Sequence, residues 1–166
     1  MDYELILPYI PNLRRYARAL VGGDRHAADD LVQDTLERAV RKFHLWKPGD
    51  LRAWLFSIMH NVFINQLKAR KIRPEVEADE TLAAPIPSAG RTDVLDLERA
   101  LGFLAPEQRE VVLLVGLEEM TYAEVAKALG IPVGTVMSRL SRGREKLRKL
   151  VDGGPSRTNP NLRVVQ

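Results

Sequence analysis

The stretch from Thr121 to Leu150 (TYAEVAKALGIPVGTVMSRLSRGREKLRKL) constrains the fold of this chain more than any other. Thr121 followed by Glu124 is the pattern of a capping box, in which each side chain satisfies a free backbone N–H at a helix start. Gly130 suits the left-handed conformation of a helix C-cap, and Pro132 has no N–H with which to continue the helix. The pattern therefore predicts a short capped helix, a tight turn and a second helix, which is the layout of a helix-turn-helix.

The second predicted helix carries a strong positive charge. Six Lys or Arg residues and one Glu fall between Arg139 and Lys149. Its apolar face comprises Val136, Leu140, Gly143, Leu147 and Leu150. An amphipathic bundle helix with solvated charges would show the same pattern. The small residues at the helix start favour the other interpretation, a recognition helix that approaches base edges in the major groove of DNA.

The composition argues against several other classes of protein. None of the 166 residues is cysteine, which excludes disulfides and cysteine-ligated metal and fits a reducing compartment. The start of the sequence lacks the basic and apolar segments of a secretory signal. No apolar run approaches the ~20 residues that a membrane span requires. We expect a cytoplasmic protein with no membrane contact of its own.

Three helices are predicted in the first 73 residues. The first covers residues 3–21 and should be regular from Pro11 onward, and the second covers residues 25–43 after a cap at Asp24. The apolar contacts expected from the second helix are Ala27, Leu31, Leu36, Val40 and Phe43. The third helix, at residues 51–71, has two apolar stripes and should lie at the centre of an N-terminal bundle.

Acidic residues in the second helix raise the possibility of a metal site. They are Asp29, Asp30, Asp34 and Glu37, with His26 nearby. A hard cation needs six or more converging oxygen ligands, which one helix face cannot supply, so solvated or partner-facing charge is the better interpretation. His60 has no evident nucleophile or orienting acid and is predicted to be a surface histidine. We expect no catalytic residue, no metal and no cofactor.

Residues 74–92 separate the N-terminal helices from the rest of the chain. Three prolines, four acids and no sustained periodicity predict a flexible linker. Helices at 93–104 and 106–118 then precede the helix-turn-helix. The predicted fold is all-α, with two small helical domains joined by the linker, and its boundaries are 1–73, 74–92, 93–151 and a disordered tail at 152–166.

Three stretches of this chain resemble one family, the bacterial sigma factors of the extracytoplasmic-function (ECF) class. The family's polymerase-binding helix resembles ADDLVQDTLERAVRKF, and its promoter-melting helix resembles LRAWLFSIMHNVFINQLKARK. Its C-terminal DNA-binding domain is similar to LAPEQREVVLLVGLEEMTYAEVAKALGIPVGTVMSRLSRGREKLR. The stretches occur in the family's order over almost all of residues 5–150, which is far more specific than a helix-turn-helix alone.

The resemblance implies that the protein functions in transcription initiation and is not an enzyme. Such a protein binds core RNA polymerase, directs it to promoter DNA and opens the start site without ATP. The N-terminal domain would read the −10 element as a single strand through Trp46, His60, Asn61, Lys68, Arg70 and Lys71. The C-terminal domain would read the −35 element as duplex through Thr135, Ser138, Arg139, Arg142 and Lys146. The polymerase would contact Asp30, Leu31, Asp34, Leu36 and Glu37.

Single positions follow the family or depart from it. Asn61 matches an Asn that contacts a base in the family's melting helix. Met137 stands where many relatives carry Arg or Lys, so no polar base contact is expected at that position. The stretches VGTVMSRL and WKPGDLRAWLF resemble the general-stress subgroup, whose anti-sigma factor is a small soluble protein. The resemblance therefore also implies an anti-sigma partner.

Two other classes of function compete with this interpretation. A stand-alone repressor or activator would need a dimerisation or ligand domain, and the N-terminal helices show neither heptads nor a pocket motif. An enzyme acting on nucleic acid would need convergent carboxylates or a metal, and the acids are spread over solvated faces. The sequence leaves open whether the two domains are splayed apart or packed together.

Overall fold

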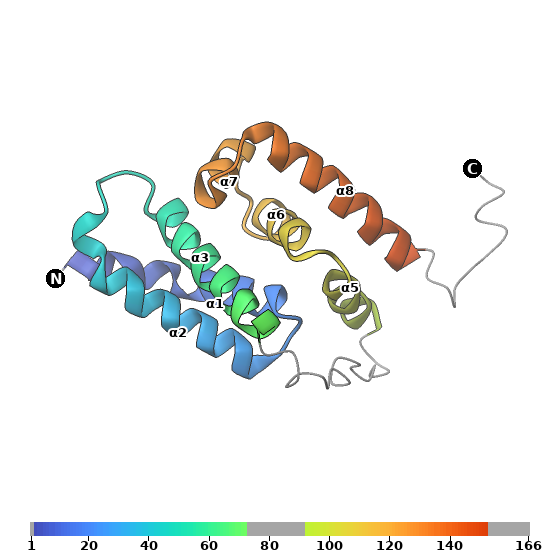
Figure 1. The fold of residues 1–166 in the computed structure, drawn as a ribbon, viewed down its shortest axis with the longest axis horizontal. Helices are drawn as coiled ribbons and strands as arrows, with labels where there is room; N and C mark the ends of the chain where they lie inside the picture. The colour runs from blue at the N-terminus through green and yellow to red at the C-terminus, as the bar shows by residue number, and fades with distance from the viewer. Residues whose placement is uncertain (1, 73–91, 153–166) are drawn as a thin grey trace.

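The computed structural model describes residues 2–72 and 92–152, and every regular element in these ranges is helical, as predicted. The N-terminal bundle consists of the 3-10 helix η1 (Asp2–Tyr9), α1 (Ile10–Leu20), α2 (Arg25–Arg41), the 3-10 helix η2 (Phe43–Leu45) and α3 (Leu51–Ile72). The C-terminal bundle consists of α5 (Thr92–Gly102), α6 (Pro106–Gly116), α7 (Tyr122–Leu129) and α8 (Val133–Asp152) (Figure 1). The predicted linker and tail lie outside the described residues.

Only the second part of the predicted helix at 3–21 is α-helical. Residues before Ile10 form η1, which contains Pro8. Proline has no N–H to donate, so an α-helix cannot run through this position without losing a hydrogen bond. Regular α-helical structure therefore begins close to Pro11, where the sequence predicted it.

The buried face of α2 differs from the prediction. The buried residues of this helix are Ala28, Leu31, Val32, Thr35 and Ala39. Val40 was predicted to be a core contact, but its side chain is 48% exposed and the adjacent Ala39 is buried instead. Thr35 is accommodated in the core because its hydroxyl donates a hydrogen bond to the Leu31 carbonyl at 2.7 Å. The helix also ends at Arg41, two residues before Phe43.

The predicted helix caps are present. Asp24 and Asp50 each accept a hydrogen bond from the backbone N–H three residues further on, at 3.1 and 3.0 Å. In the capping box, Thr121 Oγ1 accepts from the Glu124 N–H at 3.0 Å, and Glu124 Oε1 accepts from the Thr121 N–H at 2.9 Å. Gly130 ends α7 with φ of 68°, in the left-handed region. Each of these elements is therefore specified by its own local sequence.

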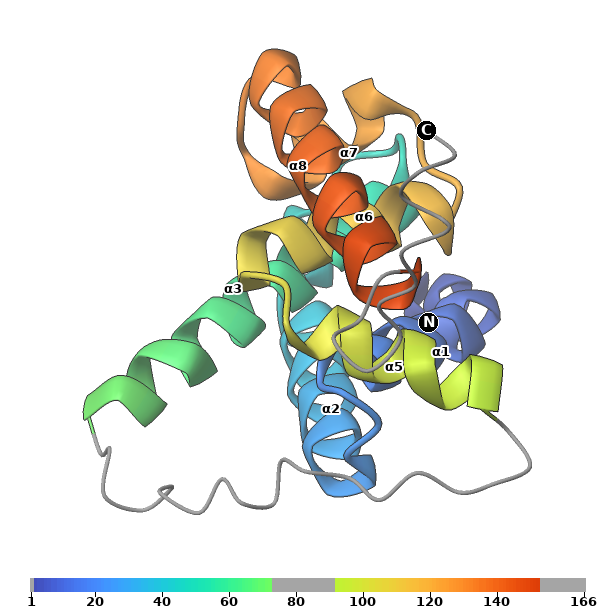
Figure 2. The same ribbon diagram turned by 90° about the vertical axis from the view of Figure 1, so that its right-hand side faces the viewer.

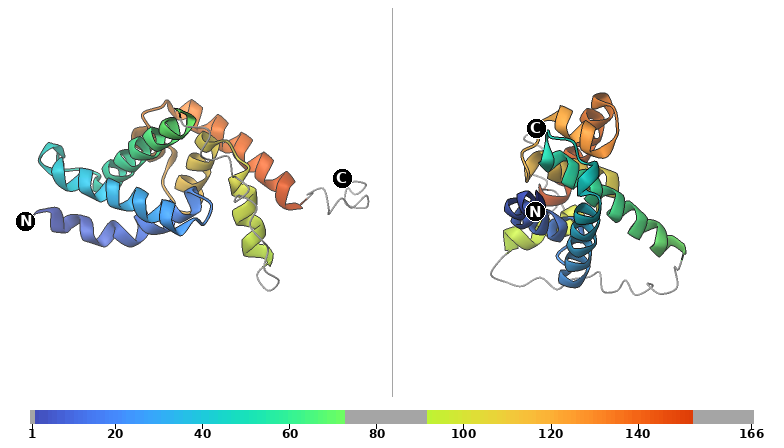
Figure 3. Two further views of the ribbon diagram at one scale, coloured as in Figure 1. Left: turned by 60° about the horizontal axis from the view of Figure 1, so that its bottom comes forward. Right: turned by 90° about the vertical axis from the view of Figure 1, so that its left-hand side faces the viewer.

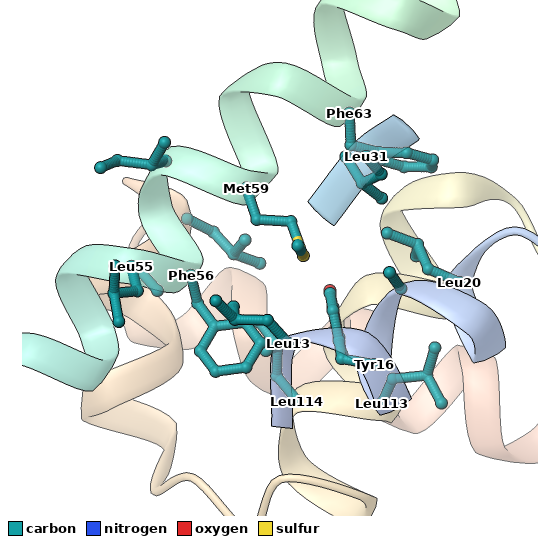
Figure 4. Close-up of a cluster of buried hydrophobic side chains, with 14 of the residues drawn as sticks. Leu13, Tyr16, Leu20, Leu31, Leu55, Phe56, Met59, Phe63, Leu113 and Leu114 are labelled. Atoms are coloured by element: carbon teal, nitrogen blue, oxygen red, sulfur yellow. The ribbon is translucent and has the colours of Figure 1, made fainter. Parts of the chain in front are cut away.

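The two bundles are packed together around one core. Leu13 and Tyr16 of α1, Phe56 of α3 and Leu113 and Leu114 of α6 belong to the same cluster of buried side chains (Figure 4). The rings of Tyr16 and Phe56 meet edge to face, with centroids 5.1 Å apart. The C-terminal helices α6 and α7 lie against α1 and α3 (Figures 1 and 3). This arrangement answers the question that the sequence left open.

Helices α6 and α8 approach each other closely at Gly143. A Cβ atom added there would lie 2.8 Å from Cγ2 of Val112 and 3.4 Å from Cβ of Gln108. We expect Gly143→Ala to lower the free energy of unfolding by about 1 kcal/mol, because overpacking costs ~1–3 kcal/mol and outweighs the ~0.5–1 kcal/mol that Ala gains over Gly in a helix.

A matched control for this prediction exists on the same helix. A Cβ added at Gly134 meets no atom within 4 Å, so Gly134→Ala should raise the free energy of unfolding. Urea denaturation followed by circular dichroism measures both variants against the parent. Equal stabilisation by the two substitutions would contradict the close approach at Gly143.

Candidate nucleic-acid interface

Helix α8 turns its basic side to solvent. Val136, Leu140 and Gly143 are buried, whereas Arg142 and Lys146 are exposed beside this buried side. Both exposed residues are among those predicted to contact the −35 element. A helix with an apolar side fixed in the bundle and a cationic side in solvent can be laid into a groove of duplex DNA without disturbing its own core.

The other predicted −35 residues are less accessible. Thr135, Ser138 and Arg139 are half-buried, and the Ser138 hydroxyl donates to the Thr135 carbonyl at 3.3 Å. Arg139 lies close enough to Glu110 of α6 for its charge to oppose the rise in that carboxyl's pKa. The structure therefore does not place all five predicted residues on one exposed surface.

A second candidate surface lies around the loop that precedes α3. An open hollow of about 400 Å³ is lined there by Trp46, Trp54 and Ser57, with Lys127 of α7 also in its wall. Phe43 contacts both tryptophans, at centroid distances of 5.3 and 6.1 Å, which holds the loop in place. Aromatic walls beside a hydroxyl and a cation suit an unstacked base and its backbone.

The predicted polar face of α3 is divided in the structure. Asn61, Lys68 and Arg70 are exposed. The C-terminal half of α3, which carries the two cations, projects away from the rest of the molecule (Figure 2). Lys71 belongs to α3, but its side chain lies outside the described residues.

His60 was predicted to be a surface histidine, and in the structure it is partly buried against the C-terminal bundle. Its side chain is 22% exposed, and its Nδ1 lies 2.7 Å from Oε2 of Glu110, which is 1% exposed. Burial raises the pKa of the Glu110 carboxyl, and the hydrogen bond with His60 opposes this rise. The two residues are 50 positions apart and in different bundles, so no local pattern could have identified the pair.

The predicted polymerase-binding residues of α2 fall into two groups. Asp30, Asp34 and Glu37 are exposed and, at steps of four and three residues, share one side of α2, whereas the half-buried Leu36 does not lie on that side. Leu31 is 0% exposed and belongs to the core, so its side chain cannot contribute a contact while α2 is packed as it is in this structure.

Two further observations concern the described residues as a whole. In residues 2–72 and 92–152, no three His, Asp or Glu side chains are grouped so that they could hold a metal ion. None of the helices in the same ranges has the length and apolar character needed to cross a membrane.

Comparison with known sequences matches each bundle to a domain family and the chain as a whole to complete proteins. Residues 6–60 match the family described as the Sigma2 domain of PhyR, and residues 95–147 match Sigma-70, region 4. The chain is 43% identical over 156 residues to the ECF RNA polymerase sigma factor EcfG of Rhodopseudomonas palustris, covering 89% of this chain and 84% of EcfG. It is 33% identical over 153 residues to the ECF sigma factor SigE of Mycolicibacterium smegmatis, covering 87% of this chain and 59% of SigE.

A solved structure shares the arrangement of the helices. The sigma factor RpoE of Bartonella quintana, crystallised with the anti-sigma factor NepR, superimposes with a TM-score of 0.74 at 34% identity, covering 90% of this chain and 96% of RpoE. A region 2 bundle and a region 4 bundle with a helix-turn-helix define a sigma factor, a transcription initiation factor that acts with RNA polymerase at promoters. The chain belongs to the ECF RNA polymerase sigma factors, which confirms the family predicted from its sequence.

Proposed function

We propose that residues 93–151 bind the −35 element as duplex DNA through α8, and that residues 1–73 read the −10 element as a single strand through α3 and the preceding loop. The observation that carries this proposal is the presence in one chain of two different surfaces, the exposed cationic side of α8 and the aromatic hollow beside α3. Lys68 and Arg70 are suited to phosphate contacts, which position the strand without reading its sequence.

Arg142 is the residue of α8 best placed to read a base, because it is exposed on the cationic side. Arg142→Ala should weaken binding to the −35 element by about 1–3 kcal/mol if the guanidinium contacts a base edge. Fluorescence anisotropy with a −35 duplex and with a scrambled duplex of the same length measures the change. Arg142→Lys keeps the charge but not the bidentate geometry, so it should lose specificity more than affinity. Equal affinity of the parent and Arg142→Ala for the −35 duplex would remove Arg142 from the site.

The exposed acidic side of α2 is the proposed contact with core RNA polymerase. Asp30, Asp34 and Glu37 recur at steps of four and three residues and are exposed, so they present three carboxylates to a partner on one side of the helix. The protein would work where the polymerase works, in the bacterial cytoplasm.

We also propose that an anti-sigma factor controls this protein in a general stress response. The support is the relatedness to EcfG and to RpoE of Bartonella quintana, which was crystallised with the anti-sigma factor NepR. The expected partner is a small soluble protein of that kind. Affinity purification of the tagged sigma factor from its own host tests this, and recovery of a membrane-anchored partner instead would contradict the proposed subgroup.

Reconstitution with bacterial core RNA polymerase tests the proposed function as a whole. Co-elution with core polymerase, followed by transcription of genomic fragments from new start sites, is the expected result and would yield the promoter elements. Failure to bind polymerase with retained binding of duplex DNA would instead favour a stand-alone helix-turn-helix regulator and overturn the assignments in the N-terminal bundle.

A further inference from the structure

Met137 places an apolar side chain on the solvent side of the basic helix α8. It is 50% exposed, whereas Val136 and Leu140, which belong to the apolar side of the helix, are 0% and 3% exposed. Packing within the bundle therefore does not account for an apolar residue at this position. Single exposed apolar residues are common on protein surfaces, so the significance of Met137 depends on what its side chain can reach.

Met137 lies in the half of α8 that would reach base edges. In a helix-turn-helix, the N-terminal residues of the second helix contact the bases in the major groove, and α8 begins about one turn before Met137. Gly134 and Ser141, at steps of three and four residues, are exposed on the same side of the helix. Both are small, and the hydroxyl of the adjacent Ser138 donates to the Thr135 carbonyl at 3.3 Å. Met137 therefore has the longest exposed side chain in the first two turns of α8.

The apolar surface of Met137 continues into an open hollow of about 530 Å³ that is lined by residues of α7 and α8. Tyr122, at the start of α7 and 39% exposed, forms part of its wall together with Leu140. Arg144 and Arg148, further along α8, line the same hollow. An apolar surface bordered by cations can receive the methyl group of a base while the cations contact the phosphates beside it.

Thymine offers an apolar contact in the major groove that the other three bases of DNA lack. Its C5 methyl group projects into the groove, where apolar side chains recognise it by contact. The thioether of Met137 has no hydrogen to donate, and its flexible chain adapts to the shape of a partner. Arg142, by contrast, can donate hydrogen bonds to a base edge. Two side chains of α8 would thus read different base pairs by different chemistry.

We propose that Met137 is a specificity-determining residue of α8, which recognises the C5 methyl group of a thymine in the −35 element by apolar contact. The proposal rests on the proposed function of α8 as the −35 reader. It requires an A·T pair in the part of the element that the first half of α8 covers. The promoter elements obtained by reconstitution give a first test, because an element without any A·T pair would overturn the assignment.

Replacement of single thymines by uracil tests the contact directly, because uracil lacks only the methyl group and keeps every hydrogen-bonding group. Fluorescence anisotropy compares a labelled −35 duplex with duplexes in which one thymine, on either strand, is replaced. At one position the replacement should lower the affinity of the full-length parent by about three- to fivefold, the effect of one buried methyl group. The same replacement should not change the affinity of Met137→Ala, which should already bind the unmodified duplex more weakly by at least this factor.

Two further variants separate this contact from general effects of substitution. Val133→Ala truncates another exposed apolar side chain of α8, which is 43% exposed, and should leave the effect of uracil unchanged. Met137→Leu keeps an apolar group of similar size and should retain most of the effect. Thermal melting of each variant by circular dichroism verifies that the helices remain folded.

The remaining outcomes are distinguishable. No effect of any uracil replacement on the parent would overturn recognition of a methyl group. An equal effect on the parent and on Met137→Ala would assign that recognition to another residue and overturn the role of Met137. Equal affinity of the parent for the −35 duplex and a scrambled duplex would instead overturn the proposed function of α8, and the role of Met137 with it.

Discussion

Phe56→Ala is expected to lower the free energy of unfolding by about 3–5 kcal/mol, the range found for truncation of a buried Phe. The side chain is 2% exposed and lies in the cluster that α1, α3 and α6 share. Its ring contacts Tyr16 edge to face at 5.1 Å, a geometry that adds to the simple burial of apolar area. The substitution would leave a cavity where the two bundles meet, so it should also loosen their association.

Chemical denaturation of Phe56→Ala and the parent measures this effect. Phe103→Ala provides the control, because Phe103 is 64% exposed in the C-terminal bundle and its truncation should change the free energy of unfolding by less than about 0.5 kcal/mol. Similar losses for the two variants would mean that Phe56 does not occupy the shared core.

Arg109→Ala is expected to lower the free energy of unfolding by about 3 kcal/mol. Charge-assisted hydrogen bonds contribute ~1.5–3 kcal/mol each, and several would be lost together. The guanidinium donates to the carbonyl oxygens of Leu20 at 2.7 Å and of Leu101 and Leu104 at 2.9 Å. It therefore ties the end of α1 to the end of α5, across the two bundles. Burial lowers the pKa of Arg109, yet an arginine in a protein stays protonated and keeps all its donors.

Arg109→Lys distinguishes geometry from charge at this position. An ammonium group cannot reproduce the planar fork that reaches separate carbonyl groups, so Lys should recover only part of the stability lost in Arg109→Ala. Urea denaturation of both variants provides the comparison, with Arg144→Ala at an exposed position of α8 as a control for the loss of one charge. Full recovery by Lys would show that charge alone is needed.

Sequence analysis located best the helices whose ends carry capping residues. The α7 helix has a capping box at Thr121 and a left-handed Gly130, and α3 begins directly after the Asp50 cap. The face of α2 was less certain because alanines and a threonine, Thr35, form much of its buried side. Small and polar residues give weak hydrophobic periodicity, which is why Val40 was placed in the core by mistake.

Sequence patterns could not predict which residues form the contacts between the two bundles. Glu110 and Glu118 stand at the two ends of the apolar run VVLLVGL, where charged residues are ordinarily exposed. Their partners His60 and Arg15 lie 50 and 103 positions away, respectively. Helical periodicity describes which side of one helix is apolar, but it carries no information about which other helix covers that side.

The projecting half of α3 has a consequence for the rate at which DNA binds. Lys68 and Arg70 are exposed on this half of the helix, so they can attract DNA before any base is read. The bimolecular encounter would then depend on ionic strength through these charges. In this scheme the speed of capture and the speed of base reading can be altered independently, by mutations on opposite ends of one helix.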